Sequence, residues 1–308
     1  VGRYIKKAGY NFIDFEKAPA FLPQKLHQAF GCGMYSARYG NVYTARQLVQ
    51  LFQRAFGEFI PQEEYWTCKN GFVDPFRPSL EPQPYGTVDE VLESKQYHLE
   101  RVKKVFTTCT VFIFTLGLTE AWEDRRDGAI YPVVPGTSAG GCFDEAIHQF
   151  HNFTYPEVWA DLEHFYALLR QVNPSCKIIL TVSPVSLMAT ATKSHVITST
   201  IYSKSVLRAA ADDFSSAHDD VDYFPSFDII TSPATRGYYY LPDGRSISSV
   251  GVDNVMHHFF TAHGHPDLGS TRTAENAQPQ ANILNVSQED IACDEEFLRE
   301  FAGGGHAK

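Results

Sequence analysis

The order of strands and helices along the chain predicts an α/β protein, a three-layer α/β/α sandwich with a parallel sheet. Apolar runs at 110–116, 177–182 and 221–224 have the length and composition of strands, and helical patterns separate them. Right-handed crossovers between such strands place them parallel in one sheet that helices cover on both faces. Chemistry in these folds lies in the loops beyond the carboxyl ends of the strands.

The first half of the chain supplies a helix, a hairpin and the strand that we expect at the centre of the sheet. Residues 1–8 are typical of the tail of a helix ended by Gly9, and 10–15 of a strand. Two capping-box patterns then open helices. The further elements expected are a helix after Thr44 to Gln47, a hairpin within 66–76, a helix from Thr87 to about Val105, and the central strand 110–116.

The second half continues the alternation. Asp127-Gly128 marks a turn in an excursion that runs to about Gly141 and that we expect to cover the strand ends. Asn173-Pro174 stops a helix that Thr154 to Glu157 opens. The remaining helices are expected over 202–217 and 249–262, and a polar tail over 263–308 with a short acidic helix near 288–301.

Composition limits the classes of partner. The 308 residues are 44% hydrophobic, enough for the core of one domain over 1–262. A net charge of -10 argues against nucleic acid or an anionic membrane surface as the main partner. The sequence has neither a membrane-spanning apolar run nor a signal peptide, although it begins at Val1 instead of Met. Its six scattered cysteines lack zinc spacing, so we expect a cytoplasmic protein with no metal or cofactor.

The candidate site residues follow the strands. Gly117 and Glu120 come directly after the run 110–116, where a glycine permits close backbone approach and a carboxylate can take part in chemistry. A solvated or structural role for Glu120 is equally open. We expect Glu120 to be partly buried and paired with Arg245 or Lys204, because an unpaired carboxylate at a strand end costs several kcal/mol.

Two serines are candidate nucleophiles, and a third stands at the position expected for a histidine. Ser183 ends the run 177–182 and belongs to the same edge, although its hydroxyl could simply satisfy backbone groups. The stretch 136–140 matches the Gly-x-Ser-x-Gly nucleophile elbow around Ser138. Pro135 before it and Gly141 after it favour a glycine-rich loop. In Asp243-Gly244-Arg245-Ser246, a serine stands where an Asp-x-x-His pair would place its histidine.

Histidines are the expected proton carriers, and none stands in an obvious position. His257 and His258 lie off the apolar stripe of the helix 249–262, which favours a surface or rim position for both. His195, in the loop after Ser183, is better placed. We therefore take His195 as the first candidate base and His258 as the second.

Several segments resemble the GSCFA-domain proteins of bacteria, which belong to the SGNH/GDSL hydrolase-like superfamily. The resemblance rests on five stretches that span most of the chain up to about Phe260 and that are specific only together. These stretches are Tyr35 to Leu48, Thr115 to Trp122, Leu180 to Val185, Tyr202 to Arg208 and Val221 to Ser226.

The resemblance implies an SGNH-like fold with a flavodoxin-like sheet and roles for several residues. Gly40 stands where the superfamily supplies an oxyanion-hole N–H, and Gly117 and Glu120 where it has Gly and Asn. An ionised glutamate cannot donate a hydrogen bond, so Glu120 departs from that role. Asp243 matches the position of the triad acid, while Ser246 replaces the base.

The resemblance also implies a serine nucleophile in a Gly-Ser-Cys-Phe-Ala block, which this sequence does not contain. We expect the chain to be cut just after that block, with the missing strand central in the sheet. The function expected is hydrolysis of esters or transfer of an acyl group to a saccharide hydroxyl, with a small-molecule or saccharide ester as substrate. The alternative is a non-catalytic saccharide-binding or assembly module on the same fold.

Overall fold

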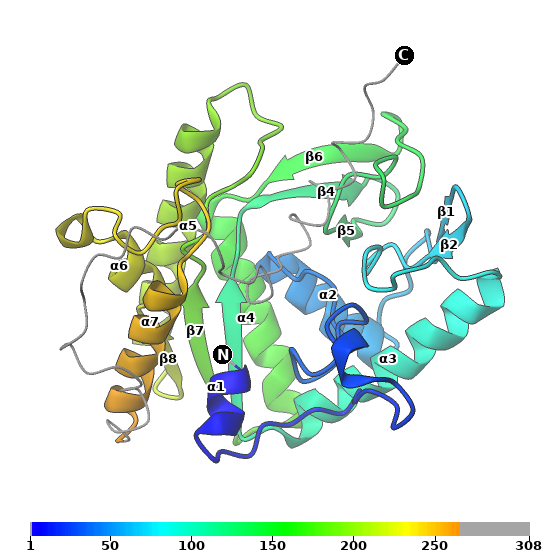
Figure 1. Ribbon diagram of the computed structural model, residues 1–308. Helices are drawn as coiled ribbons and strands as arrows, with labels where there is room; N and C mark the ends of the chain where they lie inside the picture. Colours follow the sequence, from blue (N-terminus) through cyan, green and yellow to red (C-terminus); the bar gives the residue numbers. More distant parts are fainter. Residues whose placement is uncertain (1, 265–308) are drawn as a thin grey trace.

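The computed structural model describes residues 2–264, and its organising element is a parallel three-stranded sheet (Figure 1). The sheet has the order β3-β7-β8, with β3 at Val111–Leu116, β7 at Lys177–Val182 and β8 at Val221–Phe224. Val111 pairs with Lys177 and Leu116 with Val182, so β3 and β7 end at the same level. Within the described residues the middle strand is β7, which corrects the central place expected for 110–116.

Helices cover both faces of this sheet, as the predicted three-layer α/β/α sandwich requires. The alternation of side chains along β3 and β7 divides the core: Phe114 and Leu180 face one layer, and Ile113 and Ile179 the other. The first layer is built from α2 (Ala45–Phe56), α3 (Val88–Thr108), α4 (Tyr155–Val172) and α5 (Val196–Ala217). The second contains α1 (Gly2–Lys7) and α7 (Ser249–Ala262), with the short α6 (Ser226–Thr231) packed against α7.

Local sequence signals explain where these helices begin. The Thr44 hydroxyl accepts a hydrogen bond from the Gln47 N–H, and the Gln47 side chain accepts one from the Thr44 N–H. Thr87 and Glu90 form the same capping box at the start of α3. The helix predicted over 249–262 has those bounds in the structure. α5 begins at Val196, earlier than the expected residue 202, because His195 caps it.

Antiparallel elements lie beyond the carboxyl edge of the parallel sheet (Figure 1). β4 (Glu120–Asp124) pairs with β5 (Ile130–Tyr131) around the predicted Asp127-Gly128 turn and with β6 (His148–Asn152). The excursion thus runs past the predicted end at Gly141 and forms a sheet of its own. A separate hairpin joins β1 (Trp66–Cys68) to β2 (Gly71–Val73), as expected.

The remaining segments contain one correction. Residues 10–15 are not a strand, because the Phe12 N–H bonds to Tyr10 O and the chain wraps around α1, where Lys6 Nζ lies over the Phe12 ring. Two 3₁₀ turns, Gln24–Leu26 and Pro233–Thr235, complete the described elements. The helix expected near 288–301 lies outside the described residues. No helix among residues 2–264 has the length and apolar character needed to cross a membrane.

The core prediction concerns Phe52, which is fully buried among Phe56, Phe106 and Phe165. Phe52→Ala should lower the free energy of unfolding by about 3–5 kcal/mol, because it leaves a cavity between the helices. Phe21→Ala is the control, since Phe21 is 86% exposed and its loss should change stability by about 0.5 kcal/mol or less. Urea denaturation measures both, and equal effects would contradict the packing described.

Candidate functional site

The candidate site is the edge where β3 and β7 end. The Ser183 N–H donates a hydrogen bond of 2.9 Å to the Leu116 carbonyl, which makes Gly117 and Ser183 neighbours at this edge. Both residues are half-buried. The Ser183 hydroxyl accepts a hydrogen bond from the Val185 N–H at 3.3 Å, so it takes part in the turn that ends the strand.

The segment 40–43 docks against the end of β3. The Gly117 N–H donates to the Tyr43 carbonyl at 2.8 Å, and a Cβ on Gly117 would come within 3.0 Å of the Tyr43 ring. A glycine lets the two segments approach closely, because any larger residue would require Tyr43 to shift by a few tenths of an ångström. The same hydrogen bond occupies the Gly117 amide, so an oxyanion at this edge needs a donor from another residue.

Gly40, the other glycine expected at the site, lies at the start of the docked segment. A Cβ there would be 2.6 Å from the Phe76 carbonyl oxygen and 2.9 Å from the Arg77 Cα. The segment 40–43 is therefore held between the chain near Phe76 on one end and Gly117 on the other. Its glycine is required by packing, whatever the role of its N–H group.

Two side chains of α5 form hydrogen bonds with the backbone just after β3. Lys204 is buried and donates from Nζ to the Gly117 carbonyl at 2.5 Å. The neighbouring Ser203 is also buried and accepts a hydrogen bond from the Thr119 N–H at 2.9 Å. The sequence analysis did not assign this role to either residue. Helical spacing could have indicated it, because Ser203 and Lys204 lie four and three residues before the buried Leu207 and so share its inward face.

Glu120 is partly buried and hydrogen-bonded, as expected, and two of its donors come from the loop between β7 and α5. Its carboxylate accepts hydrogen bonds from the Thr190 hydroxyl at 2.6 Å and the Ala191 N–H at 3.2 Å. Arg245 donates from Nε to the Ser186 carbonyl, and Lys204 to Gly117. Glu120 thus anchors the loop between β7 and α5 to the start of β4.

The turn at 243–246 reaches the same loop. Asp243 accepts hydrogen bonds from the N–H groups of Arg245 and Ser246, each at 2.9 Å, and from the Ser246 hydroxyl at 2.6 Å. Arg245 then ties this turn to Ser186, and the Tyr240 hydroxyl donates to the Pro184 carbonyl. The Ser246 hydroxyl therefore bonds to Asp243 where a catalytic acid would bond to a histidine ring.

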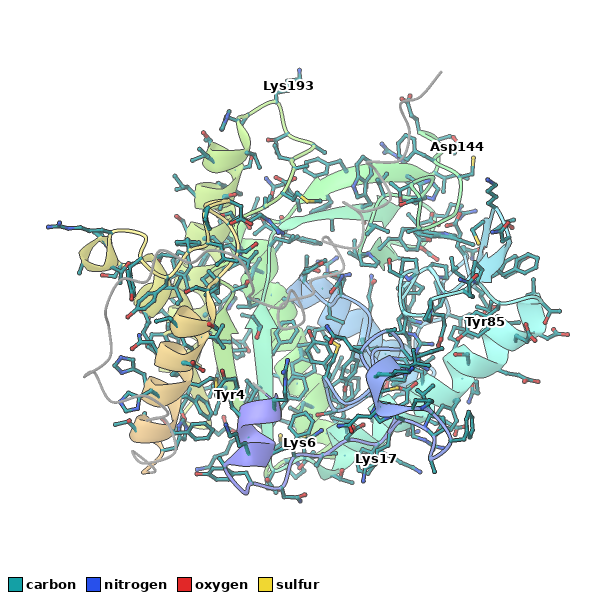
Figure 2. All side chains as sticks on the ribbon, viewed as in Figure 1. Tyr4, Lys6, Lys17, Tyr85, Asp144 and Lys193 are labelled. Carbon is teal, nitrogen blue, oxygen red and sulfur yellow. The ribbon has the colours of Figure 1, made fainter. Side chains whose placement is uncertain are left out.

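The two candidate bases lie on the surface. His195 is exposed, and its Nδ1 accepts a hydrogen bond from the Ile197 N–H at 3.2 Å as the cap of α5. Lys193, two residues earlier, lies at the outer tip of the preceding loop (Figure 2). Eight residues, about 12 Å of helix, separate His195 from Ser203 at the edge. His258 is exposed on α7, while its neighbours Phe259 and Phe260 are buried.

A buried ionic network that the sequence did not reveal lies beside Gly40. Glu16 accepts a hydrogen bond of 2.7 Å from Nδ1 of His98 and lies 3.8 Å from Arg77, which also binds Asp74 at 2.9 Å. Burial would raise the pKa of Glu16, but His98 and Arg77 outweigh it and keep this pKa below its usual value. Burial, with Arg77 nearby, lowers the pKa of His98 to about 4, so its ring is neutral at pH 7.

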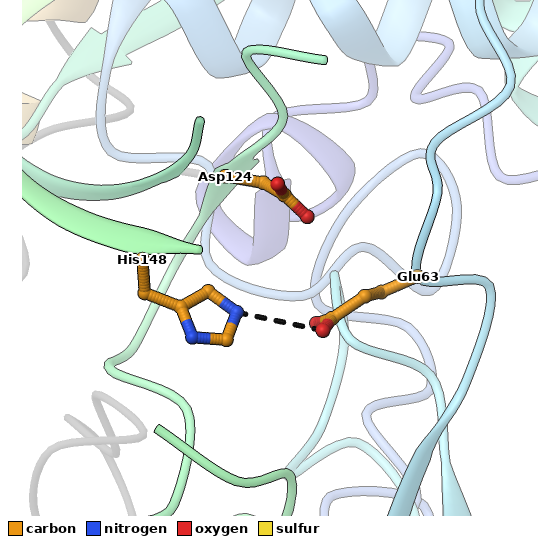
Figure 3. A group of neighbouring side chains, drawn as sticks. All are labelled: Glu63, Asp124 and His148. Atoms are coloured by element: carbon orange, nitrogen blue, oxygen red, sulfur yellow. Dashed lines mark ion pairs between the residues drawn. The ribbon is translucent and has the colours of Figure 1, made fainter. Parts of the chain in front are cut away.

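Glu63, Asp124 and His148 form a cluster with the residue types of a metal site (Figure 3). Arg126 already supplies the cation, at 2.5 Å from Asp124 and 3.2 Å from Glu63. The Asp144 N–H donates to Nδ1 of His148, so the neutral ring carries its proton on Nε2, which faces Glu63 at 3.4 Å. A protonated Nε2 cannot ligate a metal. The cluster fits a charge network that joins β4 and β6 to the segment before β1.

The fold and this edge define a three-layer α/β/α protein whose loops converge at the carboxyl ends of a parallel sheet. The model of the GSCFA family matches residues 1–259, and the chain belongs to this family, as its resemblance led us to expect. No curated protein matches the chain.

Ser203 gives a direct test of the edge geometry. Ser203→Ala should lower the free energy of unfolding by about 1–3 kcal/mol, because it leaves the buried Thr119 N–H without an acceptor. Ser205→Ala on the same helix is the matched control, since Ser205 is exposed. Chemical denaturation of both variants checks the prediction, and indistinguishable stabilities would rule out the hydrogen bond.

His98 predicts a pH dependence. Its folded pKa of about 4 lies below its ordinary value of 6.5, so between these values the unfolded chain binds more protons. Stability should therefore fall as the pH drops from 6.5 to 4, by on the order of 3 kcal/mol from this group. His98→Gln should flatten this decline and His195→Gln should keep it. Unfolding measured across that range decides, and an unchanged slope in His98→Gln would be the contrary result.

Proposed function

We propose that the chain is an SGNH-like domain that acts on acyl esters, by hydrolysis or by transfer of the acyl group to a saccharide hydroxyl. The observation that supports this most is the convergence of separate chain segments on one edge of the parallel sheet. Gly117 and Ser183 end adjacent strands, the segment 40–43 docks on Gly117, and Arg245 ties the turn 243–246 to the loop after Ser183. Ligands of open α/β sheets bind at such an edge.

In this proposal a serine attacks the acyl carbon, backbone N–H groups stabilise the oxyanion and a histidine carries the proton. The serine is that of the Gly-Ser-Cys-Phe-Ala block, which is not part of the printed sequence. We favour the Gly40 N–H as an oxyanion donor, because the Gly117 N–H is bonded to Tyr43. His195 and His258 remain the candidate bases, and both are exposed on the surface.

A saccharide is the favoured substrate class because aromatic rings lie on the face of β4 and β6 that Glu120 shares. Trp122, two residues after Glu120 on β4, points to the same side and pairs across the sheet with Phe150. Its ring contacts Phe150 at 5.8 Å and the exposed Phe143 at 5.4 Å between centroids. Aromatic surface of this kind provides the apolar wall of a ligand site.

A non-catalytic saccharide-binding or assembly module is the second candidate, and one contact favours it. The Ser246 hydroxyl donates to Asp243 at 2.6 Å, so this acid has a hydroxyl partner where a catalytic acid would orient an imidazole. On this reading the edge binds an acylated sugar without cleaving it.

Ester cleavage separates the two candidates. We expect residues 1–308 alone to leave p-nitrophenyl acetate and acetylated sugars intact. Ser183 has no histidine base to activate it, because none of the described histidines is hydrogen-bonded to it. The same chain preceded by the Gly-Ser-Cys-Phe-Ala block should cleave them, and Ser→Ala within the block should remove that activity.

Cleavage by the printed chain would contradict the assigned nucleophile and direct attention to Ser183 or Ser138, with Ser183→Ala and Ser138→Ala as the deciding variants. Binding of acetylated sugars by the extended chain without cleavage would instead favour the binding module.

A further inference from the structure

A small pocket lies beside the segment 40–43, between α2, α3 and β5. Its wall includes Gly40, Gln50, Arg54, Arg77, His98 and Ile130. Most of these side chains are buried, while Gly40 is half-buried. The pocket therefore borders both the docked segment and several charged side chains.

Arg54 has unused hydrogen-bond donors in this wall. Its side chain is only 5% exposed, and Nε and NH2 have no hydrogen-bond partner among the described residues. The Phe76 ring covers one face of the guanidinium, 3.7 Å from Cζ. Burial lowers the pKa of Arg54 to about 10, so the group is still charged at neutral pH. A buried charge with unsatisfied N–H groups is costly, which makes it the strongest binding determinant in the pocket.

The neighbouring groups do not meet this demand. The nearest carboxylate, Asp74, lies 4.0 Å from Arg54 and already accepts hydrogen bonds from Arg77 Nε at 2.9 Å and the Phe76 N–H at 3.0 Å. Gln50 is also committed, because its amide donates to the Gly128 carbonyl at 2.7 Å and accepts from the Ile130 N–H at 2.8 Å. Arg54 is thus left to pair with a group that enters the pocket.

The charges around the pocket favour a particular charge on the ligand that would pair with Arg54. The buried network holds two carboxylates, Glu16 and Asp74, against the guanidinium groups of Arg54 and Arg77, and the neutral His98 adds no charge. Asp74 repels any anion close to Arg54, but it repels a dianion about twice as strongly as a monoanion. A planar monoanion matches the fork of N–H groups that a guanidinium presents.

We propose that this pocket is a binding site for a carboxylate, held by the Nε and NH2 groups of Arg54. Gly40 borders both this pocket and the proposed ester site, but the groups that bind the carboxylate, Nε and NH2 of Arg54, take no part in the ester chemistry. Formate is the probe, since it is the smallest carboxylate and the pocket is narrow.

The experiment measures formate binding by the folded chain. Titration of ¹³C-formate should show saturable line broadening with the wild-type protein. The thermal midpoint of the protein should also rise, and above the Kd it should keep rising with the logarithm of the formate concentration. Arg54→Lys should weaken formate binding by at least about tenfold, because lysine lacks the planar fork. Arg46→Gln is the matched control on the same helix, since Arg46 pairs with Asp161 instead of lining the pocket, and it should keep the wild-type affinity.

Two results would overturn the site. Absence of saturable broadening with the wild-type protein would mean that water alone satisfies Arg54. Equal affinity in the wild-type protein and Arg54→Lys would place the bound formate elsewhere. The wild-type titration needs no variant, so an unstable Arg54→Lys does not prevent a decision, and neither result bears on whether the chain cleaves esters.

Discussion

The hydrogen bond from the Gly117 N–H to the Tyr43 carbonyl is the contact on which the rest of this molecule depends. It holds the segment 40–43 against the end of β3, and the absence of a side chain on Gly117 leaves room for Tyr43. On one side of the segment lies the edge formed by Gly117 and Ser183. At its other end, Gly40 packs against Phe76 and Arg77 and forms part of the pocket wall. One backbone contact therefore fixes both regions relative to each other.

Buried charge sets the character of both regions. Lys204 is held at the strand edge by the Gly117 carbonyl, and the pocket is framed by guanidinium and carboxylate groups. Such groups are stable in a protein interior only when each has partners, which fixes their positions closely. In the pocket, Arg54 is the exception that points to a ligand. In the cluster around Asp124, Arg126 pairs with both carboxylates, so this cluster forms a structural link.

The fold could be predicted from the sequence to the extent that its signals are local. The Thr44 capping box, the Asn70-Gly71 hairpin and the strand 177–182 have the expected places, because each depends on neighbours a few residues apart. The candidate site could be predicted only in part. The strand ends brought Gly117 and Ser183 together, but the partner of Glu120 is Thr190, seventy residues away, and the pairing of Glu16 with His98 spans eighty-two. Contacts between distant side chains leave no local pattern in the sequence. Residues 10–15 show that a local pattern can also mislead, because this strand-like run has no partner strand and packs around α1 instead.

Native-state hydrogen exchange at the Gly117 amide tests most directly whether the segment 40–43 is fixed to the end of β3. If the hydrogen bond to Tyr43 holds as described, this amide should exchange as slowly as the amides within β7, which open only with the whole domain. Exchange as fast as that of an exposed loop amide would show that the segment moves freely, and would contradict a strand edge and pocket held in one arrangement.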